Sequence, residues 1–356
     1  MRRLTVILLS LLCVLTSFSF VSCQTGFIPK RVEAGKPFQV TLNGLSQTIM
    51  VHENSSSNPV LLVLHGGPGY AMLPLMHATN PELEDEFIVV NWDQRGAGLT
   101  PDDDESKMTL ATFIQDAHEL TLWLKRKFNK DKIYILGHSF GTVLGIFLVK
   151  EYPTDYYAFV GVGQTVNVFE NEQYMYDWAL SQAIQKDDQA SIDLLGAIGR
   201  PAKNGTYLND VPESAADQFD DPSAVTMHYV TQYGGDLYGK TNTDEIDALI
   251  MQSGIYDQEE WDDAWAFSQS IFEDPEVWSF DFKDAAQGLT DFVVPVYFLM
   301  GQHDYDTPVN LFEEYYSLIT STKTWVKFDN SAHFPFYEEP QKFRDELLKV
   351  KKDTLG

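Results

Sequence analysis

Cysteine is scarce in this sequence, with only two among 356 residues. Cys13 lies within an apolar N-terminal stretch, and Cys23 follows that stretch directly. If the stretch is removed on export, one cysteine remains and no internal disulfide forms. We therefore expect the folded part to be stabilised by its apolar core.

Basic residues are also few. Lys and Arg number 25 against 52 Asp and Glu, which gives a formal net charge of −27. Such a chain repels phosphate backbones, so we expect no nucleic-acid partner. Hydrophobic residues make up 44% and aromatic residues 13% of the chain, values typical of a globular protein that exclude a disordered or fibrous one.

A long apolar run occurs at the N-terminus, where Leu4 to Ser22 carries no charge and follows Arg2 and Arg3. This pattern predicts an export signal over residues 1–22. A small residue directly before Cys23 resembles the lipobox of bacterial lipoproteins. We expect an exported lipoprotein, anchored to a membrane through lipidated Cys23, in the periplasm or at the cell surface; simple secretion and an uncleaved anchor are the alternatives. No later run is long enough to span a bilayer.

Further along, short apolar runs without alternation indicate strands buried on both faces of a parallel sheet. An Asn43-Gly44 turn between two strand-like segments predicts an antiparallel hairpin before them. Helical patterns, such as the one that begins near Thr109, separate the runs. The alternation predicts an α/β fold with a mostly parallel sheet of about eight strands. The apolar runs occupy residues 60–64, 87–90, 133–136, 158–162 and 294–300.

One interval of about 130 residues, between residues 163 and 295, is too long for a plain crossover or loop. It predicts a helical cap at residues 166–289, inserted into a catalytic domain of residues 35–165 and 290–352. The interval holds four of the seven tryptophans. Because pockets commonly form at domain interfaces, we expect some of them to face a cleft.

The sequence Gly-His-Ser-Phe-Gly at residues 137–141 follows a predicted strand and precedes a predicted helix. This context is typical of a nucleophilic serine held exposed in a sharp strand-to-helix turn, which predicts Ser139 as the nucleophile. A serine hydroxyl needs a base, and the base needs an acid to orient it. His333, in a loop after a predicted strand, is the predicted base. Asp304 is the predicted acid, with Asp306 as the alternative two residues on.

An oxyanion intermediate needs hydrogen-bond donors, and the residue after the nucleophile supplies one through its backbone N–H. That residue is Phe140. Residues 65–69, His-Gly-Gly-Pro-Gly, follow another predicted strand and supply the second donor, because glycine lets a backbone N–H approach a substrate closely. We expect Gly67 in this role, with Gly66 as the alternative.

These motifs resemble the prolyl iminopeptidase family of α/β-hydrolases, peptidase family S33. The resemblance rests on HGGPG at residues 65–69, on DQRG at residues 93–96, on the serine motif and on the His333 segment. It implies a Ser-Asp-His triad, a helical cap and the release of N-terminal residues, often proline, from short peptides. The family binds the free amine of its substrate with acidic cap residues, for which Glu170 and Glu172 are the candidates.

The same resemblance gives Asp93 and Arg95 no catalytic role, and we expect the two to pair and hold loops beside the site. The family's serine motif is usually GGSWG, so the preferred N-terminal residue is left open here. Alternatives to an aminopeptidase are an esterase or lactonase on the same scaffold and, more remotely, a non-catalytic surface binding protein. We expect no metal and no organic cofactor; the sequence leaves the oligomeric state open.

Overall fold

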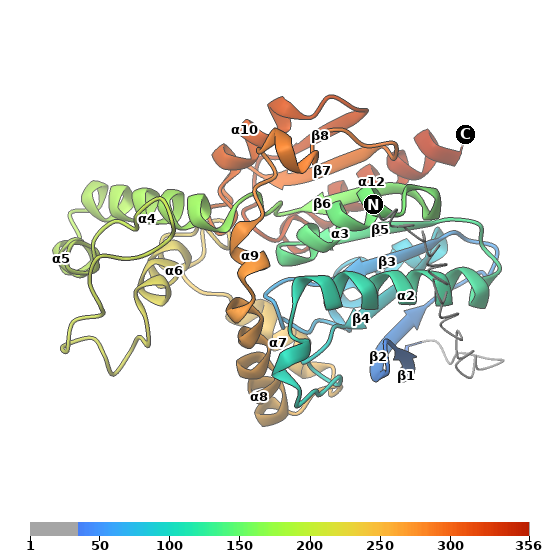
Figure 1. Cartoon of the computed structure of the whole chain (residues 1–356), viewed down its shortest axis with the longest axis horizontal. Helices are drawn as coiled ribbons and strands as arrows, with labels where there is room; N and C mark the ends of the chain where they lie inside the picture. Colours follow the sequence, from blue (N-terminus) through green and yellow to red (C-terminus); the bar gives the residue numbers. More distant parts are fainter. Residues whose placement is uncertain (1–34, 356) are drawn as a thin grey trace, which may run out of the picture.

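The computed structural model describes residues 35–355, so the predicted export signal at residues 1–22 and the predicted lipidation site Cys23 lie outside the described residues. Eight strands form one sheet in the order β1-β2-β4-β3-β5-β6-β7-β8 (Figure 1). β2 pairs antiparallel with β1 and β4, and all other neighbours are parallel, which confirms the predicted sheet. The strands are β1 (Pro37–Leu42), β2 (Leu45–His52), β3 (Val60–Leu64), β4 (Ile88–Asp93), β5 (Ile133–His138), β6 (Tyr156–Val162), β7 (Val296–Gly301) and β8 (Lys323–Phe328).

The hairpin of β1 and β2 turns at the predicted dipeptide. Asn43 has φ +47° and Gly44 has φ +82°, so both occupy the left-handed region that a two-residue hairpin turn requires. Gly tolerates this region without a Cβ penalty, and Asn tolerates it better than most residues. The local sequence therefore determines the register of this edge of the sheet.

Helices cover both faces of the sheet. α2 (Leu110–Phe128), α3 (Phe140–Glu151) and α10 (Val309–Leu318) share one apolar cluster with one face. α1 (Leu75–Thr79), α11 (Pro335–Glu338) and α12 (Pro340–Leu355) contribute to the cluster on the other. None of the helices within residues 35–355 is both long and apolar enough to cross a bilayer. Short 3₁₀ turns occupy Pro81–Asp85, Glu105–Lys107, Pro153–Asp155, Gln269–Glu273 and Ala285–Gln287.

Six helices lie between β6 and β7 in the described chain, where the sequence predicts a cap; we call residues 163–295 the insertion. Its first three helices project from the sheet (Figure 1) and enclose a separate apolar cluster. The later part packs on the main core, because Ile246 and Ile271 belong to the clusters on the two faces of the sheet. The six are α4 (Val168–Gln185), α5 (Gln189–Ile198), α6 (Pro222–Gln232), α7 (Asp244–Gln252), α8 (Gln258–Ser268) and α9 (Pro275–Ser279).

The parallel strands place the predicted site residues at one edge. β3, β5, β7 and β8 run in the same direction, so the segments that follow them meet at the carboxyl ends of the strands. These segments carry Gly67, Ser139, Asp304 and His333. The sheet topology thus gathers residues that are up to 266 positions apart (333 − 67).

Candidate active site

Ser139 occupies the tight turn between β5 and α3. Its backbone has φ +54° and ψ −125°, a conformation that residues with a Cβ rarely adopt and that is held only where the surroundings enforce it. The Ser139 N–H donates to Val162 O over 2.9 Å, which ties the turn to β6. Ser139 lines a cavity, and its Oγ forms no hydrogen bond with any described residue.

The glycines around Ser139 are required by close backbone contacts. A Cβ on Gly137 would lie 2.4 Å from Gly141 O, and one on Gly141 would lie 2.1 Å from Leu64 O. Neither neighbour is a flexible side chain, so no larger residue fits without moving the backbone. This explains why the serine needs a small residue two positions before it and two positions after it.

The structure brings the side chains of His333 and Asp304 into contact. His333 Nδ1 lies 2.9 Å from Asp304 Oδ2, and both side chains are buried. Asp304 is itself held by Thr307, whose N–H donates to Oδ1 and whose hydroxyl donates to Oδ2, each over 2.8 Å. An acid fixed in this way sets the orientation and the tautomer of the imidazole. His333 lines the same cavity as Ser139.

The other imidazole nitrogen faces the alternative acid. His333 Nε2 lies 3.2 Å from Asp306 Oδ2, so the two candidate acids contact opposite sides of one ring. Burial disfavours the charged imidazolium, but the carboxylates of Asp304 and Asp306 outweigh burial and raise the pKa of His333 to about 10. Burial also raises the pKa of Asp306, assisted by the charge of Asp304 and opposed by His333. The ring therefore lies between two acids, and no hydrogen bond joins it to Ser139 Oγ within residues 35–355.

Both predicted oxyanion donors line the cavity with Ser139, as does the alternative, Gly66. Phe140 is the first residue of α3, where backbone N–H groups have no partner within the helix and favour negative charge. Gly67 has φ +105°, and a Cβ there would lie 2.9 Å from Trp265 Cζ3. Both residues therefore line the cavity with the serine, and Gly67 has no room for a side chain, while a Cβ on the alternative, Gly66, would lie 2.5 Å from Ser139 Cβ.

The loop of residues 65–69 is held from two sides. Buried His65 accepts at Nε2 from Gln94 N–H over 3.1 Å, and burial lowers the pKa of His65 to about 4, so the ring is neutral. From the insertion, Ser268 Oγ and Gln269 Nε2 each donate to Pro68 O over 3.0 Å. The end of α8 thus lies directly on the loop that carries Gly67.

The cavity has a volume of about 790 Å³, and many of its lining residues are acidic or aromatic. Trp261 and Trp265 face it, as expected of some insertion tryptophans. Of the two acids predicted to bind an amine, Glu172 lines the cavity, whereas Glu170 lies outside it and pairs with Lys283. The acids that line the cavity are Glu172, Asp220, Asp221, Asp236, Asp247, Asp262 and Asp306.

Glu172 is held by a hydrogen bond, and no cation of the described chain forms an ion pair with it. Its Oε2 accepts from Tyr207 OH over 2.8 Å, and burial raises the pKa of Glu172 to about 7. Asp236 is buried, and its Oδ1 has no hydrogen-bond partner among the described residues. Burial together with the charge of Asp306 raises the pKa of Asp236 to about 8. The cavity therefore holds buried acids that a positively charged group would stabilise.

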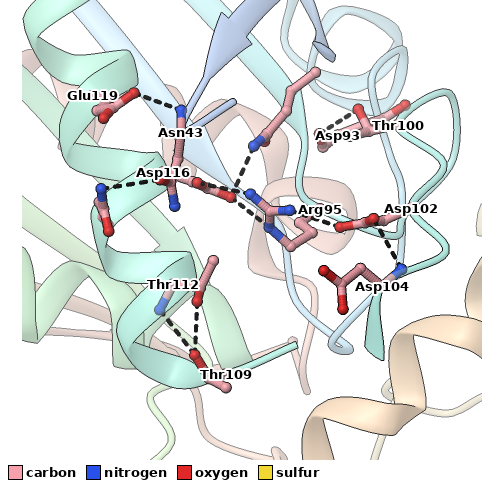
Figure 2. A network of polar contacts seen from close by, with 12 residues as sticks. Asn43, Asp93, Arg95, Thr100, Asp102, Asp104, Thr109, Thr112, Asp116 and Glu119 are labelled. Carbon is pink, nitrogen blue, oxygen red and sulfur yellow. Dashed lines mark hydrogen bonds and ion pairs between the residues drawn. The ribbon is translucent and has the colours of Figure 1, made fainter. Parts of the chain in front are cut away.

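The prediction that Asp93 and Arg95 pair with each other is wrong. Arg95 instead binds Asp116 of α2, with Nε 2.9 Å from Oδ2, and Asp102, with Nη1 2.6 Å from Oδ2 (Figure 2). Asp93 accepts from Leu99 N–H over 2.9 Å, and burial raises the pKa of Asp93 to about 7. The prediction failed because Arg95 reaches past its sequence neighbour to acids on a helix and on the following loop, a choice that sequence spacing does not reveal.

Asp236 is a cavity residue that no sequence motif indicates. It lies in the insertion, yet its backbone O accepts from His333 N–H over 2.9 Å. The motif neighbour His138 also lines the cavity, with its ring 4.6 Å from that of His333, and the pKa of His138 is well below its usual value because the ring is buried. His303 stacks on Tyr238 at 4.0 Å, outside the cavity.

One group within residues 35–355 has ligand atoms close enough to suggest a metal. Atoms of His52, His77 and Glu84 lie within 4.8 Å of one another, away from the cavity. The two imidazole rings stack, with 4.4 Å between their centroids and an angle of 6° between their planes. His77 Nδ1 and Glu84 Oε1 form a hydrogen bond of 2.5 Å. Parallel rings do not direct two lone pairs at one point, so the group fits a stacked, hydrogen-bonded pair better than a metal site.

A serine in a strained turn between strand and helix, beside a buried acid–histidine pair at the carboxyl edge of a mostly parallel sheet, defines the α/β-hydrolase class. Comparison with protein families agrees. The chain belongs to the alpha/beta hydrolase fold family, whose model matches residues 59–340.

The chain is also similar to individual proteins named as aminopeptidases or proline iminopeptidases. The chain is 29% identical over 334 residues to the "Probable aminopeptidase YbaC" of Bacillus subtilis, covering 90% of this chain and 97% of the relative. It is 24% identical over 300 residues to a "Proline iminopeptidase" of Heyndrickxia coagulans, covering 82% and 89%. The solved proline iminopeptidase-related protein of Thermus thermophilus has the same fold, with a TM-score of 0.62, 18% identity and coverage of 90% and 98%. The chain is thus a prolyl iminopeptidase-like α/β hydrolase.

Proposed function

We propose that this hydrolase is a serine aminopeptidase that releases N-terminal residues from short peptides. The observation that supports it most is the cavity itself, which combines Ser139, the buried pair of His333 and Asp304, and several acids. One relative is named as a probable aminopeptidase and another as a proline iminopeptidase, which agrees with this substrate class. A free N-terminal amine is a cation that such an acidic cavity would bind.

In the proposed reaction, Ser139 Oγ attacks the carbonyl carbon of the first residue while His333 Nε2 takes the hydroxyl proton. Asp304 keeps the imidazole in the required tautomer through Nδ1. The N–H groups of Phe140 and Gly67 stabilise the oxyanion. His333 returns the proton to the departing amine, and water then hydrolyses the acyl-enzyme, with His333 acting as base again.

An esterase or lactonase on the same scaffold is the second candidate, and an acid-free apolar cavity would favour it. The seven acids that line this cavity favour the aminopeptidase instead. The remote third candidate is a binding protein without catalysis, in which Ser139 would have no chemical role.

The test uses the purified protein with a prolyl-arylamide, an alanyl-arylamide and a short-chain nitrophenyl ester, alongside Ser139→Ala. We expect amide hydrolysis that requires a free amino terminus and is lost in the variant. Ester hydrolysis without amide hydrolysis would support the esterase instead. Activity that survives in Ser139→Ala would exclude Ser139 as the nucleophile, and no hydrolysis of any of these would support the binding protein.

We also propose that the protein is exported and anchored to a membrane through lipidated Cys23, as the N-terminal sequence predicts. Lipidation adds an acyl mass to the N-terminal peptide and moves the protein into the detergent phase. Mass spectrometry and phase partitioning of the native protein, compared with Cys23→Ser, test this. A wild-type protein that stays in the aqueous phase would favour simple secretion.

A further inference from the structure

Two acids separated by one residue bracket the imidazole of His333. Asp304 Oδ2 lies 2.9 Å from Nδ1, and Asp306 Oδ2 lies 3.2 Å from Nε2. Tyr305 between them turns to the other side and stacks on Trp178 of α4 at 4.2 Å. Nε2 is the atom that a general base must present to the nucleophile, yet Ser139 Oγ has no hydrogen bond to it.

The protonation states that fit this geometry are limited. Nδ1 is hydrogen-bonded to Asp304, so an ionised Asp304 needs a proton on Nδ1. The contact between Nε2 and Asp306 is an ion pair without a hydrogen bond, and a carboxylate at 3.2 Å favours a positively charged ring. An imidazolium has a proton on Nε2 as well as on Nδ1. It has no lone pair that could accept the Ser139 proton, so the base is disabled in the free protein.

The surrounding charges favour this disabled state. The further titratable groups near the pair are acids on three other elements and one neutral ring, namely Asp236, Glu172, Glu338 and His138. Burial opposes the imidazolium, but the carboxylates outweigh it and raise the pKa of His333 to about 10.

We propose that Asp306 determines specificity: its carboxylate keeps His333 protonated at Nε2 in the free protein, and the ammonium group of a substrate replaces the imidazolium as its partner. We call this arrangement the latch. Deprived of its second carboxylate, the imidazolium loses the Nε2 proton to solvent, and the lone pair becomes free to accept the Ser139 proton. A substrate without a cation leaves the latch closed. This inference rests on the proposed aminopeptidase function and concerns how that site selects its substrate.

A second observation supports an ammonium in this position. Asp236 Oδ1 is buried without a hydrogen-bond partner among the described residues, and Asp236 lines the cavity together with Asp306. An ammonium group has three donors, enough to contact Asp306 and to satisfy Asp236 at the same time. The backbone O of Asp236 already binds the N–H of His333, so both carboxylates belong to the surroundings of the base.

The test measures the reactivity of the serine directly. Full-length wild type, Asp306→Asn and Asp306→Ala are reacted with an uncharged fluorophosphonate, which modifies an activated serine without needing an amine, across pH 5–10. Asp263→Asn is the matched control, since Asp263 is an exposed acid on α8 that does not line the cavity. Thermal unfolding of each variant shows that it is folded, and the alanine variant removes any hydrogen bond that Asn would keep.

We expect both Asp306 variants to react at least about tenfold faster than wild type at pH 7, with the rise of the rate moved to lower pH, because each unit of lowered His333 pKa gives about ten times more neutral imidazole. Asp263→Asn should stay within about twofold of wild type. Methylammonium chloride should accelerate hydrolysis of a nitrophenyl ester by wild type, relative to sodium chloride at the same ionic strength, and should leave Asp306→Ala unchanged.

The same pH profile in wild type and in both Asp306 variants would overturn the latch. Acceleration by methylammonium that persists in Asp306→Ala would overturn the role of Asp306 as the receptor of the cation. Failure of the proposed function looks different: wild type would then react with the fluorophosphonate at Ser139 but leave alanyl-arylamide intact. A fluorophosphonate that does not label Ser139 in any of these proteins would overturn both proposals.

Discussion

Tyr256 of the insertion donates its hydroxyl to Asp93 Oδ1, at the end of β4, over 2.8 Å. The same hydroxyl accepts from Leu73 N–H over 3.0 Å, so one buried tyrosine links the insertion to the end of β4 and to the loop after β3. Asp93 is completely buried, and no cation forms an ion pair with it within residues 35–355. Its pKa of about 7, raised by burial, makes this contact sensitive to pH.

Asp93 should lower stability as the pH rises. The unfolded chain ionises near pH 4, while the folded chain keeps the Asp93 proton up to about pH 7, so stability falls between these values and the loss is constant above them. Asp93→Asn does not titrate. Relative to wild type, its free energy of unfolding should therefore rise between pH 4.5 and 8, by up to about 4 kcal/mol. Urea unfolding at several pH values measures this, and a difference independent of pH would contradict it.

Arg95 should be important for stability. Its guanidinium contacts both oxygens of Asp116 and one of Asp102 in a buried site, so removing it leaves uncompensated buried charge. We expect Arg95→Met to lower the free energy of unfolding by about 3–5 kcal/mol. Arg95→Lys keeps the charge but not the fork of donors, and should recover only part of the loss. The exposed pair of Arg200 and Asp177 gives the control, since Arg200→Met should cost about 1 kcal/mol or less.

Replacing glycine by alanine should have opposite effects on folding in the serine turn and in a helix with open space around the glycine. A Cβ at Gly141 would meet Leu64 O at 2.1 Å, so Gly141→Ala should disrupt the turn and greatly reduce the yield of folded protein. Gly196 lies in α5 with open space around it, so Gly196→Ala should stabilise the protein by about 0.5–1 kcal/mol. Thermal unfolding and soluble yield measure both. Equal effects at the two positions would mean that the close contact at Gly141 is not restrictive.

Glu172 and Glu170 form a matched pair on α4 for the proposed amine binding. Glu172 lines the cavity, whereas Glu170 is paired with Lys283 outside it. Glu172→Gln should raise KM for a free-amine arylamide roughly tenfold, the value of one charged hydrogen bond, and Glu170→Gln should leave KM nearly unchanged. Because the pKa of Glu172 is about 7, wild-type KM should fall as the pH rises through 7 and Glu172 becomes ionised. Equal KM values in the two variants would exclude Glu172 from substrate binding.

The orienting acid is tested by Asp304→Asn. Its Oδ2 accepts from His333 Nδ1, and an amide there would favour the wrong tautomer. If Asp304 is the triad acid, kcat should fall by about 10³–10⁴-fold with little change in thermal stability. A decrease below tenfold would instead favour Asp306 as the orienting acid.

Local patterns in the sequence sufficed for the sheet and for the serine turn. The strand, the small residues and the helix around Ser139 are neighbours in the chain, and the order of Ser139, Asp304 and His333 follows the parallel strands. The partners of Arg95 and the position of Asp236 were not predictable, because both depend on how distant segments pack. The two acids on opposite sides of His333 likewise result from ring orientation, which sequence spacing does not determine.

The insertion is joined to the catalytic loop at the residue between the two acids. Tyr305 stacks on Trp178, its N–H donates to Gly235 O over 2.8 Å, and Asn171 Nδ2 donates to Asp306 O over 2.7 Å. α4 and the chain after α6 therefore both contact the loop that carries Asp304 and Asp306. Because these contacts are direct, a displacement of α4 should change the positions of both acids relative to His333.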